Sequence, residues 1–104
     1  MKLTRKKAIS ITIELWEELA ERGCEKWKCV EFWKKYGEMA NGCPLCEYNA
    51  YSKNSGCYQC PYYLRFGCCD GNDDAPYSKW GNADAPLTRK KYASQVLAQL
   101  RELE

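Results

Sequence analysis

The segment 43-CPLCEYNAYSKNSGCYQC-60 decides how the rest of this 104-residue chain is interpreted. It contains Cys43, Cys46, Cys57 and Cys60 with the spacing C-x2-C-x10-C-x2-C. Two intervening residues allow a tight turn to direct both sulfurs of a pair at one ion, and a second pair then completes a tetrahedron. Thiolates are soft donors, and tetrahedral thiolate sites favour zinc or iron–sulfur chemistry. The spacing therefore predicts a structural Zn²⁺ site with these four cysteines as ligands.

An iron–sulfur cluster, disulfides and free thiols are the alternatives for the same quartet. Many zinc knuckles have a glycine directly after the second cysteine, whereas here Glu47 and Pro61 occupy those positions. A closed four-thiolate site leaves no open position for water or substrate, so its zinc is structural and supplies free energy of folding. Cys68 or Cys69 could replace one member of the quartet.

The cellular compartment bears on what the cysteines do. The chain has eight cysteines, and its N-terminus lacks the apolar run and cleavage site of a secretory signal. Its apolar stretches are all shorter than the ~20 residues that span a bilayer. We therefore expect a cytoplasmic protein with reduced thiols and no membrane partner. In that compartment paired cysteines bind metal more often than they form disulfides.

The flanks of the cysteine-rich segment have helical patterns. Thr4 is a suitable N-cap and Gly23 a suitable end for an N-terminal helix. The apolar spacing from Trp27 to Tyr36 predicts a second short helix or a 3₁₀-rich segment that ends at Gly37. The apolar stripe after residue 88 predicts a C-terminal helix with Thr88 as its N-cap.

These patterns predict one domain over residues 1–104, with a helical part (1–42), a cysteine-rich zinc-binding segment (43–87) and a C-terminal helix (88–104). The middle segment holds six cysteines and all four prolines and has poor periodicity. The expected fold is a small α-rich or α+β domain in which N- and C-terminal helices flank a loop-rich, zinc-stapled segment of zinc-knuckle or ribbon type.

Several function classes find no support. The chain has no histidine, so histidine-dependent catalysis is excluded, and it contains no phosphate-binding glycine motif. We therefore do not expect an enzyme. A net charge of +2 is too small for a strongly basic nucleic-acid module and has the wrong sign for a DNA mimic. Cys24 and Cys29 do not share one helix face, and we interpret them as small buried hydrophobic residues.

Aromatic residues crowd the cysteine-rich segment. They can pack around the zinc, but tyrosine, tryptophan and arginine also dominate the energetic centres of protein interfaces. On that chemistry alone, we predict partner contacts by Tyr62, Tyr63 and Trp80 and by the basic residues Arg89, Lys90 and Lys91. Arg5, Lys6 and Lys7 could extend the basic patch.

The order of motifs resembles a known group of proteins. It runs from Glu14-Leu-Trp16 through Trp33-Lys-Lys-Tyr36-Gly37 and the two Cys-x-x-Cys units to Pro76-Tyr-Ser-Lys-Trp80 and a leucine-rich helix. This order resembles small phage-encoded cysteine-rich proteins, and it is similar to the zinc-containing anti-CRISPR proteins that inhibit type II effector nucleases.

The resemblance implies a stoichiometric inhibitor in the cytoplasm of an infected bacterial host. It implies that Cys43, Cys46, Cys57 and Cys60 hold zinc as a structural staple, and that the protein binds the host type II CRISPR–Cas effector and prevents loading of target DNA. No small-molecule substrate and no membrane are implied. The alternative function is that of a zinc-knuckle nucleic-acid-binding regulator, whose affinity would fall steeply with salt.

Overall fold

The computed structural model describes residues 4–37, 43–50, 60–67 and 74–104, and its first element is α1, Arg5–Arg22. The Thr4 hydroxyl accepts a hydrogen bond from the Lys7 N–H at 3.1 Å, as predicted for the N-cap. Gly23 ends the helix in the left-handed conformation, with φ 65°. A Cβ atom at Gly23 would lie 2.5 Å from the carbonyl oxygen of Pro86, so only glycine fits there.

The C-terminal helix α6, Pro86–Arg101, begins before the predicted boundary. Pro86 occupies its first turn, where the fixed φ of proline suits a helix and the missing N–H costs nothing. The N-cap is Ala85, which makes no side-chain capping bond, and Thr88 lies inside the helix. The predicted helix is confirmed, but its predicted cap at Thr88 is wrong because proline chemistry sets the start.

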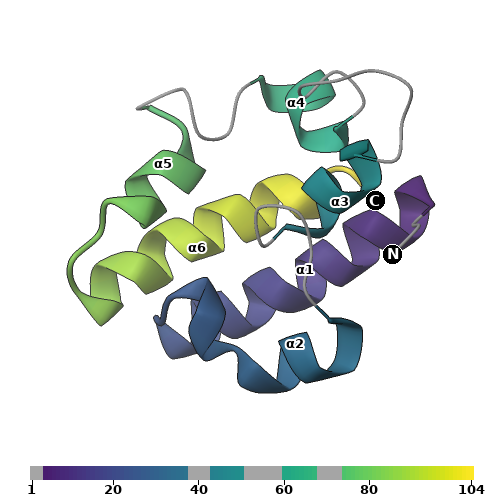
Figure 1. The fold of residues 1–104 in the computed structure, drawn as a ribbon. Coiled ribbons are helices and arrows are strands. Elements are labelled where there is room, and N and C mark those ends of the chain that lie inside the picture. The colour runs from purple at the N-terminus through teal and green to yellow at the C-terminus, as the bar shows by residue number, and fades with distance from the viewer. Residues whose placement is uncertain (1–3, 38–42, 51–59, 68–73) are drawn as a thin grey trace.

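The frame of the fold is the pair formed by α1 and α6, which lie side by side in opposite directions (Figure 1). Leu15 and Leu19 of α1 and Ala93 and Leu100 of α6 are almost completely buried. Full burial of one leucine side chain stabilises the folded state by roughly 1.5–3 kcal/mol. The apolar stripes that the sequence predicted therefore face the core.

A 3₁₀ turn, η1 (Lys26–Lys28), and a short helix, α2 (Val30–Tyr36), follow α1. The sequence allowed either a short helix or a 3₁₀ segment between Trp27 and Tyr36. The structure contains both, with the 3₁₀ turn first and the helix after it. The N–H of Gly37 bonds to the Trp33 carbonyl and ends α2 as predicted. The helix α2 lies along α1 on the side away from α4 (Figure 1), and its buried Phe32 joins the core.

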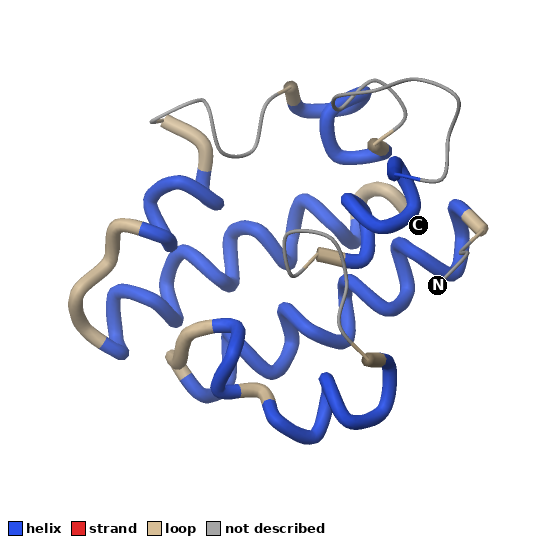
Figure 2. The backbone as a smooth tube through the Cα atoms, in the orientation of Figure 1, coloured by secondary structure: helices blue, strands red, loops and turns tan. Residues whose placement is uncertain are grey.

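The described parts of the cysteine-rich segment form three short helices: α3 (Pro44–Ala50), α4 (Pro61–Phe66) and α5 (Pro76–Gly81). Each begins at a proline, which is well suited to a first helical turn. The described part of the segment is thus more helical than the predicted loop-rich, zinc-stapled form, which is not confirmed. Within the described ranges the chain contains helices and loops and no strand (Figure 2), so the α-rich form of the predicted fold is the one observed.

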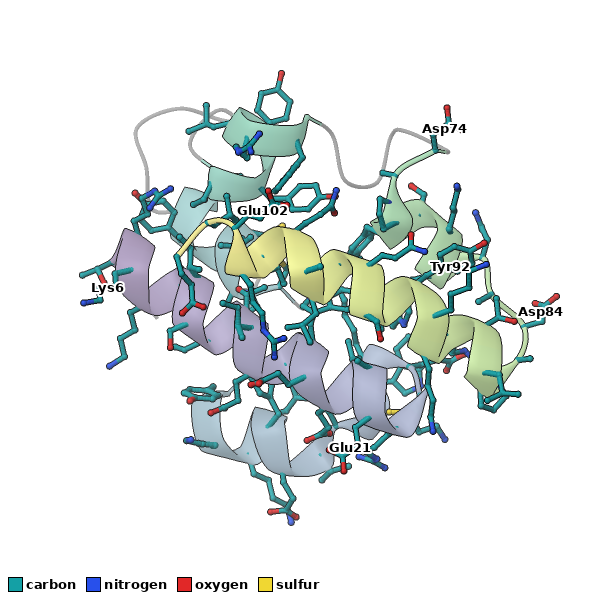
Figure 3. All side chains as sticks on the ribbon, turned by 180° about the vertical axis from the view of Figure 1, so that it is seen from behind. Lys6, Glu21, Asp74, Asp84, Tyr92 and Glu102 are labelled. Carbon is teal, nitrogen blue, oxygen red and sulfur yellow. The ribbon has the colours of Figure 1, made fainter. Side chains whose placement is uncertain are left out.

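One hydrophobic core joins side chains from α1, α2, α3, α4, α5 and α6. An ion pair between Arg65 and Glu102, at 3.6 Å, links α4 to the end of α6 at the surface; Figure 3 labels Glu102 there. In the described part of the chain, no helix has the length and apolar character needed to cross a membrane.

Candidate metal centre

Three of the four predicted zinc ligands line one small cavity. Cys43 directly precedes α3, Cys46 lies in the first turn of α3, and Cys60 directly precedes α4. All three border a cavity of about 40 Å³ whose other walls include Trp16 from α1 and Leu100 from α6. Packing on the α1–α6 frame therefore places Cys60 near the cysteine pair that lies 14 to 17 positions earlier in the sequence.

The prolines explain the local geometry around the first and last of these cysteines. A residue before proline is restricted to extended conformations, and Cys60 has φ −70° and ψ 122° before Pro61. Cys43 precedes Pro44 in the same way. Each of these two cysteines directly precedes the first proline of a short helix, and Cys60 has the extended backbone that this position favours.

The described residues do not by themselves complete a metal site. Among them, no three cysteine, aspartate or glutamate side chains converge closely enough to hold a metal ion. The fourth predicted ligand, Cys57, and the possible substitutes Cys68 and Cys69 lie outside the described residues. The donor set nevertheless suits zinc, because three cysteine sulfurs, which are soft donors, border one mostly apolar cavity. Zinc at this site therefore stays a prediction.

Charge near the cavity favours an anionic sulfur. A hydrogen bond from Cys46 and the positive charge of Lys26 lower the pKa of Cys43 to about 6, against the opposing effect of burial. A thiolate is the form of cysteine that binds metal. The cavity thus holds at least one sulfur prepared for ligation at neutral pH.

Lys26 is the residue that sequence analysis missed. It belongs to η1, yet its side chain is only 8% exposed. Its Nζ donates a hydrogen bond to the Tyr77 hydroxyl at 2.6 Å. The same Nζ lies 4.7 Å from the centre of the Tyr77 ring and 5.9 Å from the centres of the Trp16 and Trp80 rings. Such cation–π contacts stabilise a buried ammonium by roughly 0.5–2 kcal/mol each.

The buried ammonium requires a source of negative charge. Within the described residues no carboxylate pairs with Lys26. Burial acts to lower the pKa of Lys26, but the negative charge available at Cys43 and Tyr77 outweighs it and leaves the pKa raised. The indole N–H of Trp80, in the same cluster, is buried and finds no acceptor among the described residues. The positive charge of Lys26 therefore lies close enough to act on Cys43, as an anionic thiolate centre would require.

Two of the predicted partner contacts are not surface residues. Tyr62 is 4% exposed, and its hydroxyl donates to Gln99 Oε1 at 2.6 Å. Trp80 is 8% exposed and packs edge-on against Trp16, with ring centres 4.8 Å apart. Tyr63 is half-buried and lines the cysteine cavity. Tyr62 and Trp80 contribute most of their apolar area to the core, and the structure leaves little of either side chain at the surface for a partner.

The predicted basic patch is divided by the fold. Arg89 is mostly buried and pairs with Glu25 at 3.7 Å, while Lys90 is half-buried and Lys91 is exposed. Because α1 and α6 run in opposite directions, the basic residues 5–7 lie near Leu103, at the other end of the frame. The two basic runs therefore cannot form one surface, contrary to the extension that the sequence suggested.

The most exposed large aromatic side chain lies elsewhere in the described part of the chain. Trp27 in η1 is 67% exposed, and Val30 at the start of α2 is 53% exposed. Sequence analysis assigned Trp27 and Val30 to the apolar repeat of a helix, and its spacing gave no sign that they face solvent. The Trp33 indole N–H donates a hydrogen bond to the Lys26 carbonyl oxygen at 2.9 Å, and this bond holds the backbone of η1, the turn that carries Trp27.

Comparison of this chain with models of protein families, with curated protein sequences and with solved structures found no match.

Proposed function

We propose that this protein is a zinc-stapled helical domain that acts by binding another protein, and that its partner is a type II CRISPR–Cas effector. The exposed Trp27 carries the protein-binding part of the proposal. The sequence resemblance to zinc-containing anti-CRISPR proteins supplies the candidate partner. Binding before target DNA arrives would prevent DNA loading, and this inhibition requires no catalytic residue.

The surface around Trp27 has the features of an interface centre. A tryptophan offers a large apolar area at low conformational cost, and such residues dominate binding energy when a partner covers them. Val30 extends the apolar area along the chain, and the exposed Lys28 borders it with positive charge, while Lys34 pairs with Glu31 at 3.8 Å. Because Lys26, one residue before Trp27, is anchored among the aromatic rings, the tryptophan projects from an ordered turn.

The zinc part of the proposal rests on the shared cavity of Cys43, Cys46 and Cys60 and on the ammonium beside it. With Cys57 these residues would hold the ion through four thiolates. Bound zinc would supply folding free energy that the short helices lack. It would keep α3 and α4 docked on the frame.

The nucleic-acid alternative has one observation in its favour. Arg22, Lys28 and Arg89 border a surface groove of about 420 Å³ between the end of α1 and the start of α6. However, Arg22 already pairs with Glu18 at 3.0 Å and Arg89 with Glu25. These pairs reduce the positive charge available to phosphates, so protein binding is the function we favour.

An order-of-addition experiment tests the proposal. The zinc-loaded protein is added to a guide-loaded type II effector before or after target DNA, and DNA cleavage is measured. We expect inhibition only when the protein is added first, together with co-elution of protein and effector in size exclusion. Trp27→Ala should weaken inhibition by about tenfold or more, whereas Leu64→Ala, at another exposed apolar side chain, should leave it unchanged.

The opposite results have distinct meanings. Separate elution at micromolar concentration, with cleavage unchanged in either order, would overturn the effector proposal. Equal inhibition by wild type and Trp27→Ala would place the interface away from η1. Salt-sensitive binding to DNA or RNA alone would support the nucleic-acid alternative.

A further inference from the structure

The aromatic cluster around Lys26 and the cysteine cavity have two side chains in common. Nζ of Lys26 lies 4.7 Å from the centre of the Tyr77 ring and 5.9 Å from the centre of the Trp16 ring. Both rings also line the cavity that the three described zinc-ligand candidates border. Lys26 comes from η1 and Tyr77 from α5, 51 positions later in the sequence. A single aromatic side chain therefore connects the ammonium to the cavity of the thiols.

The cluster has more hydrogen-bond donors than the described residues satisfy. An ammonium carries three N–H donors, and the hydrogen bond to the Tyr77 hydroxyl, at 2.6 Å, uses one of them. Lys26 is only 8% exposed, and across the described ranges it has no carboxylate partner. The indole N–H of Trp80 is buried without an acceptor in the same part of the chain. A buried charge is costly unless it is paired, so an anionic group should lie close to this cluster.

The Tyr77 hydroxyl can extend the influence of the ammonium to the cavity. A tyrosine hydroxyl accepts and donates hydrogen bonds, whereas an ammonium only donates them. Because the Tyr77 oxygen accepts from Lys26, its own hydrogen is left for a second partner. A hydroxyl that accepts from a cation also becomes a stronger donor. Since Tyr77 lines the cavity, a thiolate sulfur there is a suitable acceptor.

We propose that Lys26 and Tyr77 form a hydrogen-bond relay behind the predicted zinc ligands. In this relay Lys26 donates to the Tyr77 oxygen, and the Tyr77 hydroxyl donates to a cysteine thiolate of the loaded site. The relay rests on the zinc site of the proposed function and adds two residues that do not bind the metal themselves. Four thiolates bring more negative charge than one Zn²⁺ ion neutralises, and the ammonium offsets part of the excess. Hydrogen-bond partners behind the ligands orient them and tune metal affinity.

A second lysine–tyrosine pair provides a matched control. Nζ of Lys35 lies 4.9 Å from the centre of the Tyr36 ring, close to the 4.7 Å between Lys26 and Tyr77. Lys35 is exposed, however, and pairs with Glu14 at 3.3 Å. Tyr36 does not line the cysteine cavity. The two pairs therefore have the same ring contact, but only the pair of Lys26 is buried beside the thiols.

Zinc affinity measures the contribution of the relay. The zinc-loaded full chain and its variants are titrated with a chelator of known affinity, after circular dichroism has shown that each is folded. Lys26→Met and Tyr77→Phe should each lower zinc affinity by about 10–100-fold. The double variant should lose no more than either single variant, because either change breaks the same relay. Tyr36→Phe should bind zinc as tightly as wild type.

A spectroscopic measurement separates the relay from a loss of stability. The protein is loaded with Co²⁺, and the sulfur-to-cobalt charge-transfer band is recorded. Hydrogen bonds and nearby positive charge stabilise the sulfur lone pairs, so this transition should move to longer wavelength in Lys26→Met and Tyr77→Phe. Leu15→Ala, which removes a buried side chain of the frame, should leave the band in place, as should Tyr36→Phe.

The possible failures are distinguishable. Wild-type protein that binds no zinc would overturn the zinc staple and the relay together. Wild-type protein that binds zinc, with the same affinity and band position in Tyr77→Phe, would overturn the relay alone. Losses that add up in the double variant would also overturn it, because the two residues would then act separately. Tyr77→Phe decides the matter if Lys26→Met does not fold, since it removes only the hydroxyl group and keeps the ring.

Discussion

The α1–α6 frame and the cysteine-rich region use different means to hold their shape. The frame helices have 18 and 16 residues, whereas α3, α4 and α5 have seven, six and six. Isolated helices below about 12–15 residues are marginal in water, because nucleation costs more than a few hydrogen bonds return. The long helices can bury a continuous stripe, while the short ones depend on what they are attached to.

This difference indicates which helices of the protein a bound metal would stabilise. Leu15 and Leu19 are buried by the frame itself, so the frame is stabilised by ordinary apolar burial. The cavity beside α3 and α4 is instead lined by thiols and aromatic rings, and one of these rings, Tyr77, accepts a hydrogen bond from the Lys26 ammonium. We therefore expect metal removal to affect the short helices far more than the frame.

The largest expected effect comes from removing the predicted zinc. Zinc-finger peptides gain about 10–16 kcal/mol of apparent free energy on binding zinc, which exceeds the effect of most side-chain substitutions. Cys46→Ser should abolish zinc binding and accelerate hydrogen exchange in α3 and α4, while α1 and α6 remain protected. The control Cys24→Ser should retain wild-type zinc content. Wild-type protein in the presence of zinc that is no more stable than Cys46→Ser would refute the zinc staple.

An intermediate effect tests the frame. Leu15→Ala removes a completely buried side chain from α1 and should lower the free energy of unfolding by about 2–5 kcal/mol. A small domain has about 5–15 kcal/mol in total, so the loss should be plain in urea denaturation with zinc present. Ser10→Ala, at an exposed position of the same helix, should change stability by less than about 0.5 kcal/mol. Equal losses from both variants would contradict the assignment of the core.

The smallest effect concerns the connection between the two regions. Lys26→Met keeps the apolar stem but removes the ammonium beside Cys43, and the loss of its cation–π contacts should cost about 1–2 kcal/mol. In metal-free protein, the pKa of Cys43 should rise from about 6, so the pH profile of its alkylation should shift upward. Lys28→Met, at an exposed neighbouring lysine, should leave that profile unchanged.

The sign of the pH dependence follows from the same charge pair. The folded-state pKa of Cys43 lies below its ordinary value of 9.0. Its contribution to stability is therefore fully present above that ordinary value and is lost as the pH falls through about 6. Denaturation of metal-free wild type and of Lys26→Met across this range should give stabilities whose difference narrows as the pH falls through about 6, down to the loss of the cation–π contacts, which remains at low pH. Parallel curves would show that Lys26 does not act on Cys43.

The sequence predicted the ends of α1 well because those signals are local. Thr4 and Gly23 act within one turn of the helix, through a hydroxyl acceptor and a left-handed backbone. The start of α6 was placed too late because a good capping residue, Thr88, was preferred over Pro86. The short helices of the cysteine-rich segment were missed because their apolar patterns are too brief to show a period.

The sequence by itself determined the two frame helices, a short helical or 3₁₀ stretch that ends at Gly37, and a cysteine spacing that suits zinc. The tertiary structure decided that Cys60 shares a cavity with Cys43, that Lys26 is buried while Trp27 is exposed, and that Tyr62 and Trp80 belong to the core. The reason is physical. Caps and periodicity act within a turn or two of the chain, whereas burial depends on which faces of distant helices meet.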